Sequence, residues 1–187
     1  MHARQIKLFI IVIIAFATGM SVESNAQDLT PSLPVNPDTK LITYQEVVKV
    51  DGTIKDLFSR AIDWININYK NPADVTKVRD PESGLIEILH RIELERTDKQ
   101  DTKIDAGIII YTLKLELKDG RYRYTITDLN LKQSSKFPIE RWLDKKDKAY
   151  NPNWNLYLTQ MDKEIKTLIE SLKKGMLPVI KKKEEIW

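Results

Sequence analysis

Residues 85–131 read LIEILHRIELERTDKQDTKIDAGIIIYTLKLELKDGRYRYTITDLNL, and this stretch decides the fold of the 187-residue chain. Apolar and polar side chains alternate with a period of two over 85–95, over 108–118 and again over 121–131, which is typical of strands with one buried face. A polar segment at 98–103 separates the first two segments. The pair Asp119-Gly120 separates the last two and favours a two-residue hairpin turn. The sequence therefore predicts three consecutive antiparallel strands.

The alternation changes phase near the end of the third strand. Tyr122, Tyr124 and Ile126 share one face, whereas Leu129 and Leu131 fall out of that register. One extra residue in a strand has this effect, so we expect a β-bulge near Asp128.

The residues that precede this stretch predict a strand, a helix and a short strand. Alternation over 41–50 indicates a strand, and Asp51-Gly52 ends it. Apolar residues then recur at helical spacing from Ile54, behind Thr53 as a candidate N-cap and Asp56 as its capping partner. This helix is expected to end before Asn71-Pro72, and 75–78 is expected to form a short strand.

The residues that follow it predict a long loop and a second helix. The loop covers 132–153, a length that is usually functional or packed as a lid. Apolar residues at helical spacing indicate a helix over 155–174, with Gly175 as its C-terminal cap and Pro178 beyond it. The fold class is therefore α+β: an antiparallel sheet of about five strands, in the order β-α-β-β-β-β-α, with the helices packed on one face.

The first 26 residues are typical of a cleaved signal peptide. Arg4 and Lys7 precede an apolar run over 8–17, and Ser24-Asn25-Ala26 supplies the small residues that favour cleavage after Ala26. The alternative is a membrane anchor, but about 10 apolar residues span only about 15 Å as a helix. We therefore expect a periplasmic or secreted protein, with no stable membrane span after signal cleavage. The proline-containing segment 27–40 is expected to be an extended leader, and 41–187 a single domain.

Composition excludes several kinds of chemistry. The chain has no cysteine, so disulfides, thiolate nucleophiles and cysteine zinc sites are absent. His90 is the only histidine after signal cleavage, and no metal or cofactor motif is found, so we expect no cofactor and no metal. The formal net charge is only +3 and the lysines alternate with acidic residues, which argues against a nucleic-acid partner.

Several short segments resemble one family of exported bacterial proteins. They are Leu33-Pro34-Val35, the strand segment 42–48 (ITYQEVV), the helix positions Leu57-Phe58, Ala61 and Trp64, then Asn68-Tyr69-Lys70 and 122–128 (YRYTITD). The family is the domain of unknown function 4468, described as having a TATA-binding-protein-like (TBP-like) fold, and the resemblance covers about 33–131. It implies a helix-gripping antiparallel sheet and carries no implication of DNA binding.

Three ionisable residues fall on the predicted apolar strand faces: Glu46, His90 and Asp128. A buried charge costs several kcal/mol unless it is paired, so these positions need an explanation. One hypothesis is a polar cluster on a concave sheet face, rimmed by tyrosines that include Tyr111, Tyr122 and Tyr124. The alternative is structural: strand ends are exposed, tyrosine hydroxyls satisfy the carboxylates, and Asp128 lies at the bulge.

The aromatic residues also allow two interpretations. Tyrosines on a sheet bind sugars or aromatic ligands, or they pack against a helix with the hydroxyl at the rim. Trp142, which precedes the second helix, either seals a pocket between loop and sheet or fills the edge of the core.

The main functional hypothesis is a non-enzymatic exported binding module. It would hold an envelope protein partner or a small apolar ligand between the sheet and the C-terminal helix. The alternative is a hydrolase-like enzyme that uses His90 with Glu46 or Asp128. A third hypothesis is an interaction subunit of an envelope assembly.

Overall fold

The computed structural model describes residues 31–178. The predicted signal peptide, residues 27–30 of the predicted leader and the segment 179–187 lie outside the described residues. The elements are β1 (Tyr44–Lys49), α1 (Ile54–Asn68), α2 (Pro72–Val75), β2 (Thr76–Asp80), β3 (Leu85–Thr97), β4 (Lys103–Lys118), β5 (Arg121–Leu131), β6 (Phe137–Pro138), the 3-10 helix η1 (Ile139–Leu143) and α3 (Asn153–Gly175).

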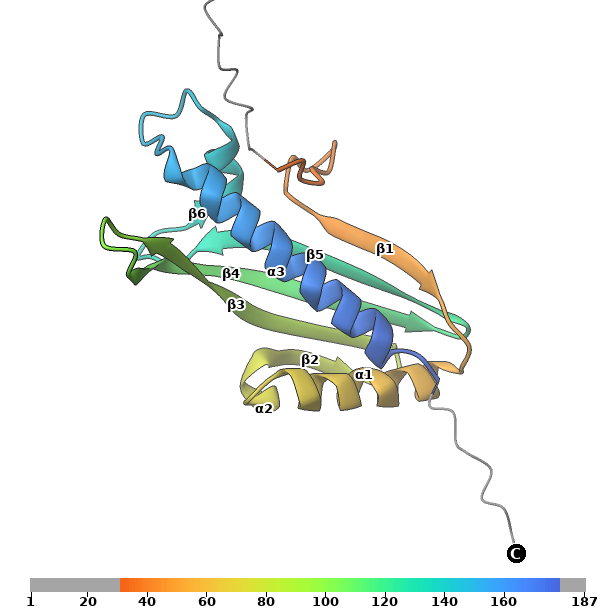
Figure 1. The fold of residues 1–187 in the computed structure, drawn as a ribbon. Helices are drawn as coiled ribbons and strands as arrows, with labels where there is room; N and C mark the ends of the chain where they lie inside the picture. Colours follow the sequence, from red (N-terminus) through yellow and green to blue (C-terminus); the bar gives the residue numbers. More distant parts are fainter. Residues whose placement is uncertain (1–30, 179–187) are drawn as a thin grey trace, which may run out of the picture.

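The strands form one antiparallel sheet in the order β1-β5-β4-β3-β2, with β6 paired to the end of β5 (Figure 1). Lys118 lies opposite Arg121, so Asp119-Gly120 is the two-residue turn that the sequence predicts. The predicted bulge is confirmed: the β4–β5 register shifts between Ile110 and Thr112, and Asp128 has a positive φ of 55°. The extra residue turns Leu129 into the core, where it is fully buried.

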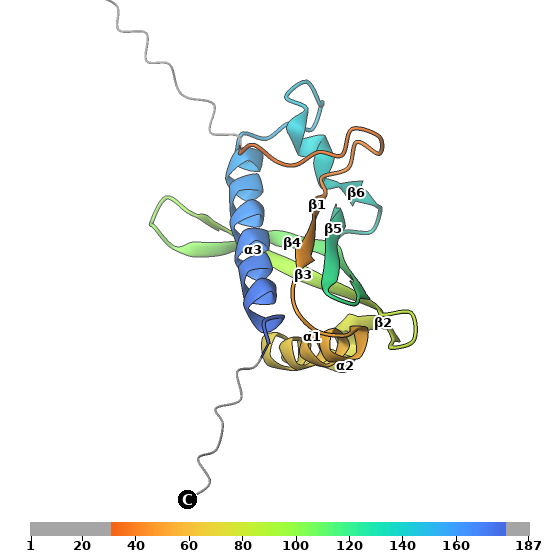
Figure 2. The ribbon, with the colours of Figure 1, turned by 90° about the vertical axis from the view of Figure 1, so that its right-hand side faces the viewer.

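The helices pack on one face of the sheet, and α3 crosses this face diagonally toward the end of α1 (Figures 1 and 2). The side chains of the covered face belong to one buried core that includes Ile88 of β3, Leu113 of β4 and Ile126 of β5. The predicted α+β class, an antiparallel sheet with helices packed on one face, is thereby confirmed.

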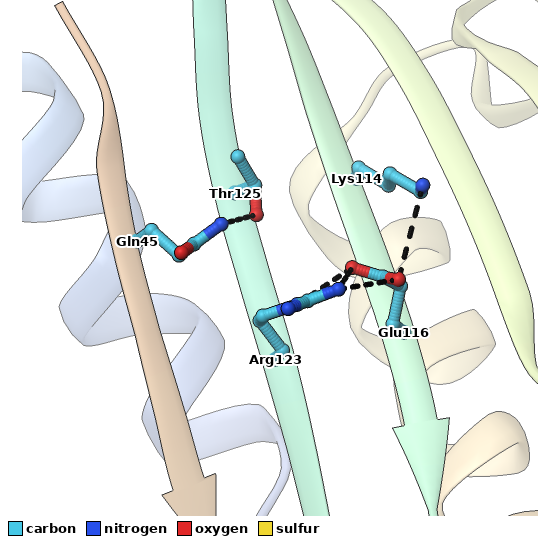
Figure 3. A network of polar contacts seen from close by, with 5 residues as sticks. All are labelled: Gln45, Lys114, Glu116, Arg123 and Thr125. Atoms are coloured by element: carbon cyan, nitrogen blue, oxygen red, sulfur yellow. Dashed lines mark hydrogen bonds and ion pairs between the residues drawn. The ribbon is translucent and has the colours of Figure 1, made fainter. Parts of the chain in front are cut away.

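The opposite face of the sheet is polar and carries cross-strand pairs (Figure 3). Arg123 of β5 donates two hydrogen bonds of 2.7 Å to the Glu116 carboxylate of β4. Gln45 Nε2 donates to Thr125 Oγ1 at 2.8 Å. Because one face of the sheet is buried and the other is exposed, apolar and polar residues alternate along each strand, which is the period that the sequence shows.

The capping of α1 agrees with the sequence prediction. Thr53 Oγ1 accepts a hydrogen bond from the Asp56 N–H at 3.2 Å, and the Asp56 carboxylate accepts one from the Thr53 N–H at 2.9 Å. This reciprocal pair is a capping box, which satisfies two N–H groups that the first turn leaves unpaired.

Three local predictions need correction. The second hairpin strand begins at Lys103 rather than at residue 108, and the short helix α2 before β2 was not predicted. Gly175 lies inside α3, and Met176 is the C-cap. The absence of a side chain at Gly175 instead allows close approach of Trp64, because a Cβ there would lie 2.6 Å from Trp64 Cδ1.

Part of the predicted extended leader is folded. Val35 pairs with Ile42, and a turn between them is closed by hydrogen bonds from Lys40 N–H to Asn36 O and from Asn36 N–H to Leu41 O, both 2.9 Å. The Asn36 side chain accepts further bonds inside this turn, so the segment 35–42 forms a hairpin beside β1.

Within residues 31–178, no helix combines the length and the apolar character that crossing a membrane would require.

Candidate ligand-binding groove

An open groove of about 920 Å³ lies between α3 and β3. We call it the α3–β3 groove. Its lining includes Tyr69, His90 and Tyr111 on the floor and Gln160, Lys163 and Leu168 on the α3 wall. Its volume falls in the range of about 300–1,000 Å³ that is typical of ligand sites.

The floor is built from aromatic rings in edge-to-face contact. The His90 ring lies 4.7 Å from the Tyr69 ring at an interplanar angle of 82°, and 6.1 Å from the Tyr111 ring at 86°. Tyr69 comes directly after α1, whereas His90 and Tyr111 are register partners on β3 and β4. The groove floor therefore depends on the packing of α1 against the sheet.

The Tyr69 hydroxyl is buried and makes no well-formed hydrogen bond within residues 31–178, although the Tyr111 phenol lies beside it. Burial, together with the neighbouring Tyr111 phenol, raises the pKa of Tyr69. Burial also raises the pKa of Tyr111, to about 12; the adjacent Tyr69 hydroxyl opposes this shift, and the Glu164 carboxylate adds to it. Both phenols are therefore protonated donors at neutral pH, and an unsatisfied buried donor costs about 1–3 kcal/mol.

His90 is half-buried, and this burial lowers the pKa of its imidazole. Arg91 lowers this pKa further, while Glu93 opposes the shift. His90 is therefore neutral at pH 7. In residues 31–178, no hydrogen bond or ion pair joins His90 to an acidic side chain.

Hydrogen bonds join α3 to β3 and to α1 along the groove. At one end the Gln160 side chain of α3 accepts from the Glu95 N–H at 3.0 Å and donates to the Glu95 carbonyl at 2.6 Å. At the other end Trp64 Nε1 donates to Ser171 Oγ at 3.1 Å, and Ser171 Oγ donates to Asn68 Oδ1 at 2.7 Å. These bonds fix α3 relative to β3 and α1.

The rim of the groove carries charges that are partly paired. Arg91 lies 3.3 Å from Glu93, and Lys103 lies 2.8 Å from Glu95. These pairs are exposed, so they contribute little to stability. They leave the rim close to neutral, which favours a ligand without a large net charge.

The structure separates Glu46 from His90, which corrects the proposed pairing. Glu46 lies in register with Tyr124 on β5, then Leu115 on β4 and Ile86 on β3, whereas His90 lies four residues further along β3. That separation is about 14 Å across the sheet and about 13 Å along it. The two side chains therefore cannot share a proton.

Glu46 is held instead at the C-terminal end of α3. Its carboxylate accepts from Lys173 Nζ at 2.8 Å and from the Tyr124 hydroxyl at 2.9 Å. The Lys173 bond, and then the Tyr124 bond, lower the pKa of Glu46. The structural interpretation of Glu46, a carboxylate satisfied by a tyrosine hydroxyl, fits this position.

Asp128 also does not reach His90. The bulge places Asp128 in an exposed position and gives the inward position to Leu129. The prediction that Asp128 lies on the apolar face is wrong, because the bulge reverses which residue of the pair faces the core.

The other three predicted site residues, Tyr122, Tyr124 and Trp142, also lie outside the groove. Tyr122 is fully buried on β5, and this burial raises the pKa of its phenol to about 12. Trp142 of η1 stacks on Trp154 of α3 with centroids 5.9 Å apart and an interplanar angle of 22°. Of the seven candidate residues, the groove thus includes His90 and Tyr111.

Sequence reasoning missed several groove residues, chiefly Tyr69 and Gln160. The sequence places Tyr69 inside the first helix, which is expected to end before Asn71-Pro72, whereas the structure ends this helix at Asn68 and leaves Tyr69 as the C-cap. Gln160 had no signal, because its contact with Glu95 joins residues 65 positions apart.

Asp162 was missed as well, in a separate buried cluster. It accepts hydrogen bonds from the Tyr44 hydroxyl at 2.8 Å and from Lys166 Nζ at 2.7 Å. A polar residue inside the apolar stripe of α3 was the signal for it.

Comparison with known proteins gives a family match over most of the sheet and α1. Residues 44–132 match the family described as "Domain of unknown function (DUF4468) with TBP-like fold". This range begins at β1 and ends after β5, so it omits α3. A comparison with curated proteins gives no significant match.

Two solved structures with this fold align with most of the chain, although their sequence identity to it is low. One is a TBP-like protein from Parabacteroides distasonis, with 14% identity, a TM-score of 0.59 and coverage of 80% of this chain and 97% of that one. Another is a DUF4468 family protein from Bacteroides ovatus, with 9% identity, a TM-score of 0.59 and coverage of 83% and 95%. At these identities the likeness establishes the fold alone.

Proposed function

Because residues 44–132 carry the DUF4468 domain with its TBP-like fold, we propose that this protein is an exported binding module that holds its ligand in the α3–β3 groove. The observation that carries the proposal is a groove of ligand size whose aromatic floor contains a buried phenol, Tyr69, that makes no well-formed hydrogen bond within residues 31–178. Its occupant is an apolar ligand or a segment of a partner protein.

The surroundings of His90 support binding rather than acid–base catalysis. General acid–base pairs require hydrogen-bond distance between their members or one bridging water. Glu46 is engaged with Lys173, and Asp128 is displaced by the bulge, so neither proposed partner reaches His90. His90 instead contributes an aromatic edge to the groove floor.

Export is supported by the N-terminal sequence. The apolar run of residues 8–17 and the small residues before Gln27 favour cleavage by a signal peptidase. Amino-terminal sequencing of the protein recovered from the bacterial envelope or medium is expected to begin at Gln27. Recovery of the uncleaved chain from the cytoplasm would contradict export.

A bulky side chain in the groove is expected to block binding. Thr167 lines the groove from α3, and its hydroxyl donates to the Lys163 carbonyl at 2.9 Å. The probe is the amphiphilic dye 1-anilinonaphthalene-8-sulfonate, whose aromatic rings bind apolar sites and whose fluorescence rises on transfer from water to such a site. Thr167→Trp is expected to weaken dye binding about tenfold or more, since the indole occupies the apolar volume.

Thr159→Trp provides the matched control. Thr159 is also exposed on α3 and makes the same bond, to the Asn155 carbonyl at 2.8 Å, but it does not line the groove. This variant is expected to bind the dye as the unmodified protein does. Equal affinity in all three proteins, or no dye binding by the unmodified protein, would contradict the proposal.

A further inference from the structure

We propose that the ligand is a short extended segment of a partner protein, which adds as a strand to the free edge of β3 beside Arg91 and Glu93. This inference rests on the proposed function of the α3–β3 groove. It names the class of ligand and the backbone groups that recognise it.

The direction of each backbone group on β3 follows from one hydrogen bond. The Leu117 N–H donates to the Gly84 carbonyl at 2.8 Å, so position 84 directs its backbone toward β4. Backbone groups of successive strand residues point to opposite sides, and the β3–β4 register is regular up to Leu94. Even-numbered positions of β3 therefore bond to β4, and odd-numbered positions point to the other edge.

Neighbours occupy the two ends of that outer edge. β2 covers one end, where Asp80 pairs with Leu85 and Val78 with Glu87, and its pairing stops at Ile88. At the other end the Gln160 amide binds both the N–H and the carbonyl of Glu95. Gln160 thus supplies the same donor and acceptor that a neighbouring strand would supply.

Between these ends, the outward N–H and carbonyl groups of Arg91 and Glu93 have no hydrogen-bond partner among the described residues. Unpaired edges are usually shortened, covered or charged, because they act as templates for pairing with another chain. Here the side chains of Arg91 and Glu93 pair with each other. The free stretch is bounded on both sides, and both residues line the α3–β3 groove.

A strand added at this edge would present alternate side chains to the two faces of the sheet. Those on the helix side would enter the groove beside Tyr69, His90 and Leu168. The Tyr69 hydroxyl, which makes no well-formed hydrogen bond among the described residues, lies on this side. We therefore expect an apolar or aromatic side chain there, together with an oxygen acceptor. Recognition of this kind combines main-chain hydrogen bonds with a pocket for alternate side chains.

Proline at an outward position tests this mode of binding directly. Arg91→Pro and Glu93→Pro each remove one outward N–H and leave the bonds to β4 intact, which is the position in a sheet where proline is tolerated. The probe is a synthetic heptapeptide selected on the mature protein from a random phage-displayed library. Each proline variant is expected to bind this peptide about tenfold or more weakly by calorimetry.

Arg91→Ala is the control, because it removes the side chain and keeps the N–H. Arg91→Pro is expected to bind the peptide about tenfold or more weakly than Arg91→Ala, since both variants lack the guanidinium group and only the proline variant lacks the N–H. A second measurement does not depend on the folding of the variants. Replacing single peptide amides by esters is expected to weaken binding at alternate positions, because only every second peptide N–H faces β3.

The outcomes separate this inference from the proposed function. Binding that is lost in Thr167→Trp but unchanged in both proline variants, with no alternation in the ester series, would overturn strand addition and leave the groove function standing. A selected peptide that binds Thr167→Trp and Thr159→Trp equally, together with equal dye binding by the two variants, would overturn both. Failure to select any peptide, with the dye still bound in the groove, would overturn strand addition alone.

Discussion

Replacing Trp64 by alanine is expected to lower the free energy of unfolding by about 3–5 kcal/mol, the range for truncation of a buried tryptophan. Trp64 is 3% exposed and joins α1 to α3. Its indole donates to Ser171 and lies against Gly175, and its ring meets Tyr69 edge-on at 5.7 Å. Truncation leaves a cavity where the two long helices pack against each other.

Denaturant unfolding measures this effect. Leu177→Ala serves as the control, because Leu177 is 58% exposed beyond the end of α3, and its loss is expected to stay within about 0.5 kcal/mol. A loss below about 1 kcal/mol for Trp64→Ala would mean that α3 does not rest on α1 through this side chain.

Gly84→Val is expected to cost about 2–5 kcal/mol, through backbone strain and overpacking together. Gly84 has a φ of +68°, and a Cβ at this position would lie 2.6 Å from both the Leu117 carbonyl oxygen and Ile54 Cδ1. Because one of these contacts is a backbone atom in the sheet, the neighbour cannot move away without loss of the adjacent ladder bond.

Gly120→Ala separates the two causes. Gly120 has a similar φ of +73°, but no atom lies within 4 Å of a Cβ built there. It is therefore expected to cost only about 1–2 kcal/mol, the conformational part alone. Equal decreases in the free energy of unfolding for the two variants would show that the steric contacts at Gly84 do not contribute to the cost of replacing it.

The strands were predictable because their period is a local property of the sequence. Residues 85–131 form β3, β4 and β5 with the expected apolar face, and even the bulge at Asp128 was visible as a change of phase. The outward direction of the Asp128 side chain was not predictable. At a bulge, two adjacent residues lie opposite one residue of the partner strand, and the sequence alone does not show which of the two points inward.

The groove was only partly predictable. The alternation of apolar and polar residues predicts that His90 and Tyr111 share one apolar face of the sheet. Their ring contacts with Tyr69 depend on how α1 packs against the sheet, which the sequence does not show. Glu46 shares the same pattern and yet lies three strands away, since alternation gives the face of a residue and not its place along the sheet. The free edge of β3 depends on where β2 begins, because Thr76 pairs with Ile88; the predicted strand 75–78 begins one residue before β2.

The most direct test of the ligand site is an amide chemical-shift map of isotope-labelled mature protein titrated with the selected heptapeptide. The largest shifts are expected at residues 89–95 of β3, at Tyr69 and along the groove side of α3 between Leu156 and Ser171. Shifts concentrated instead on the open face of the sheet, around Gln45, Glu116 and Arg123 (Figure 3), would contradict the assignment of the α3–β3 groove as the binding site.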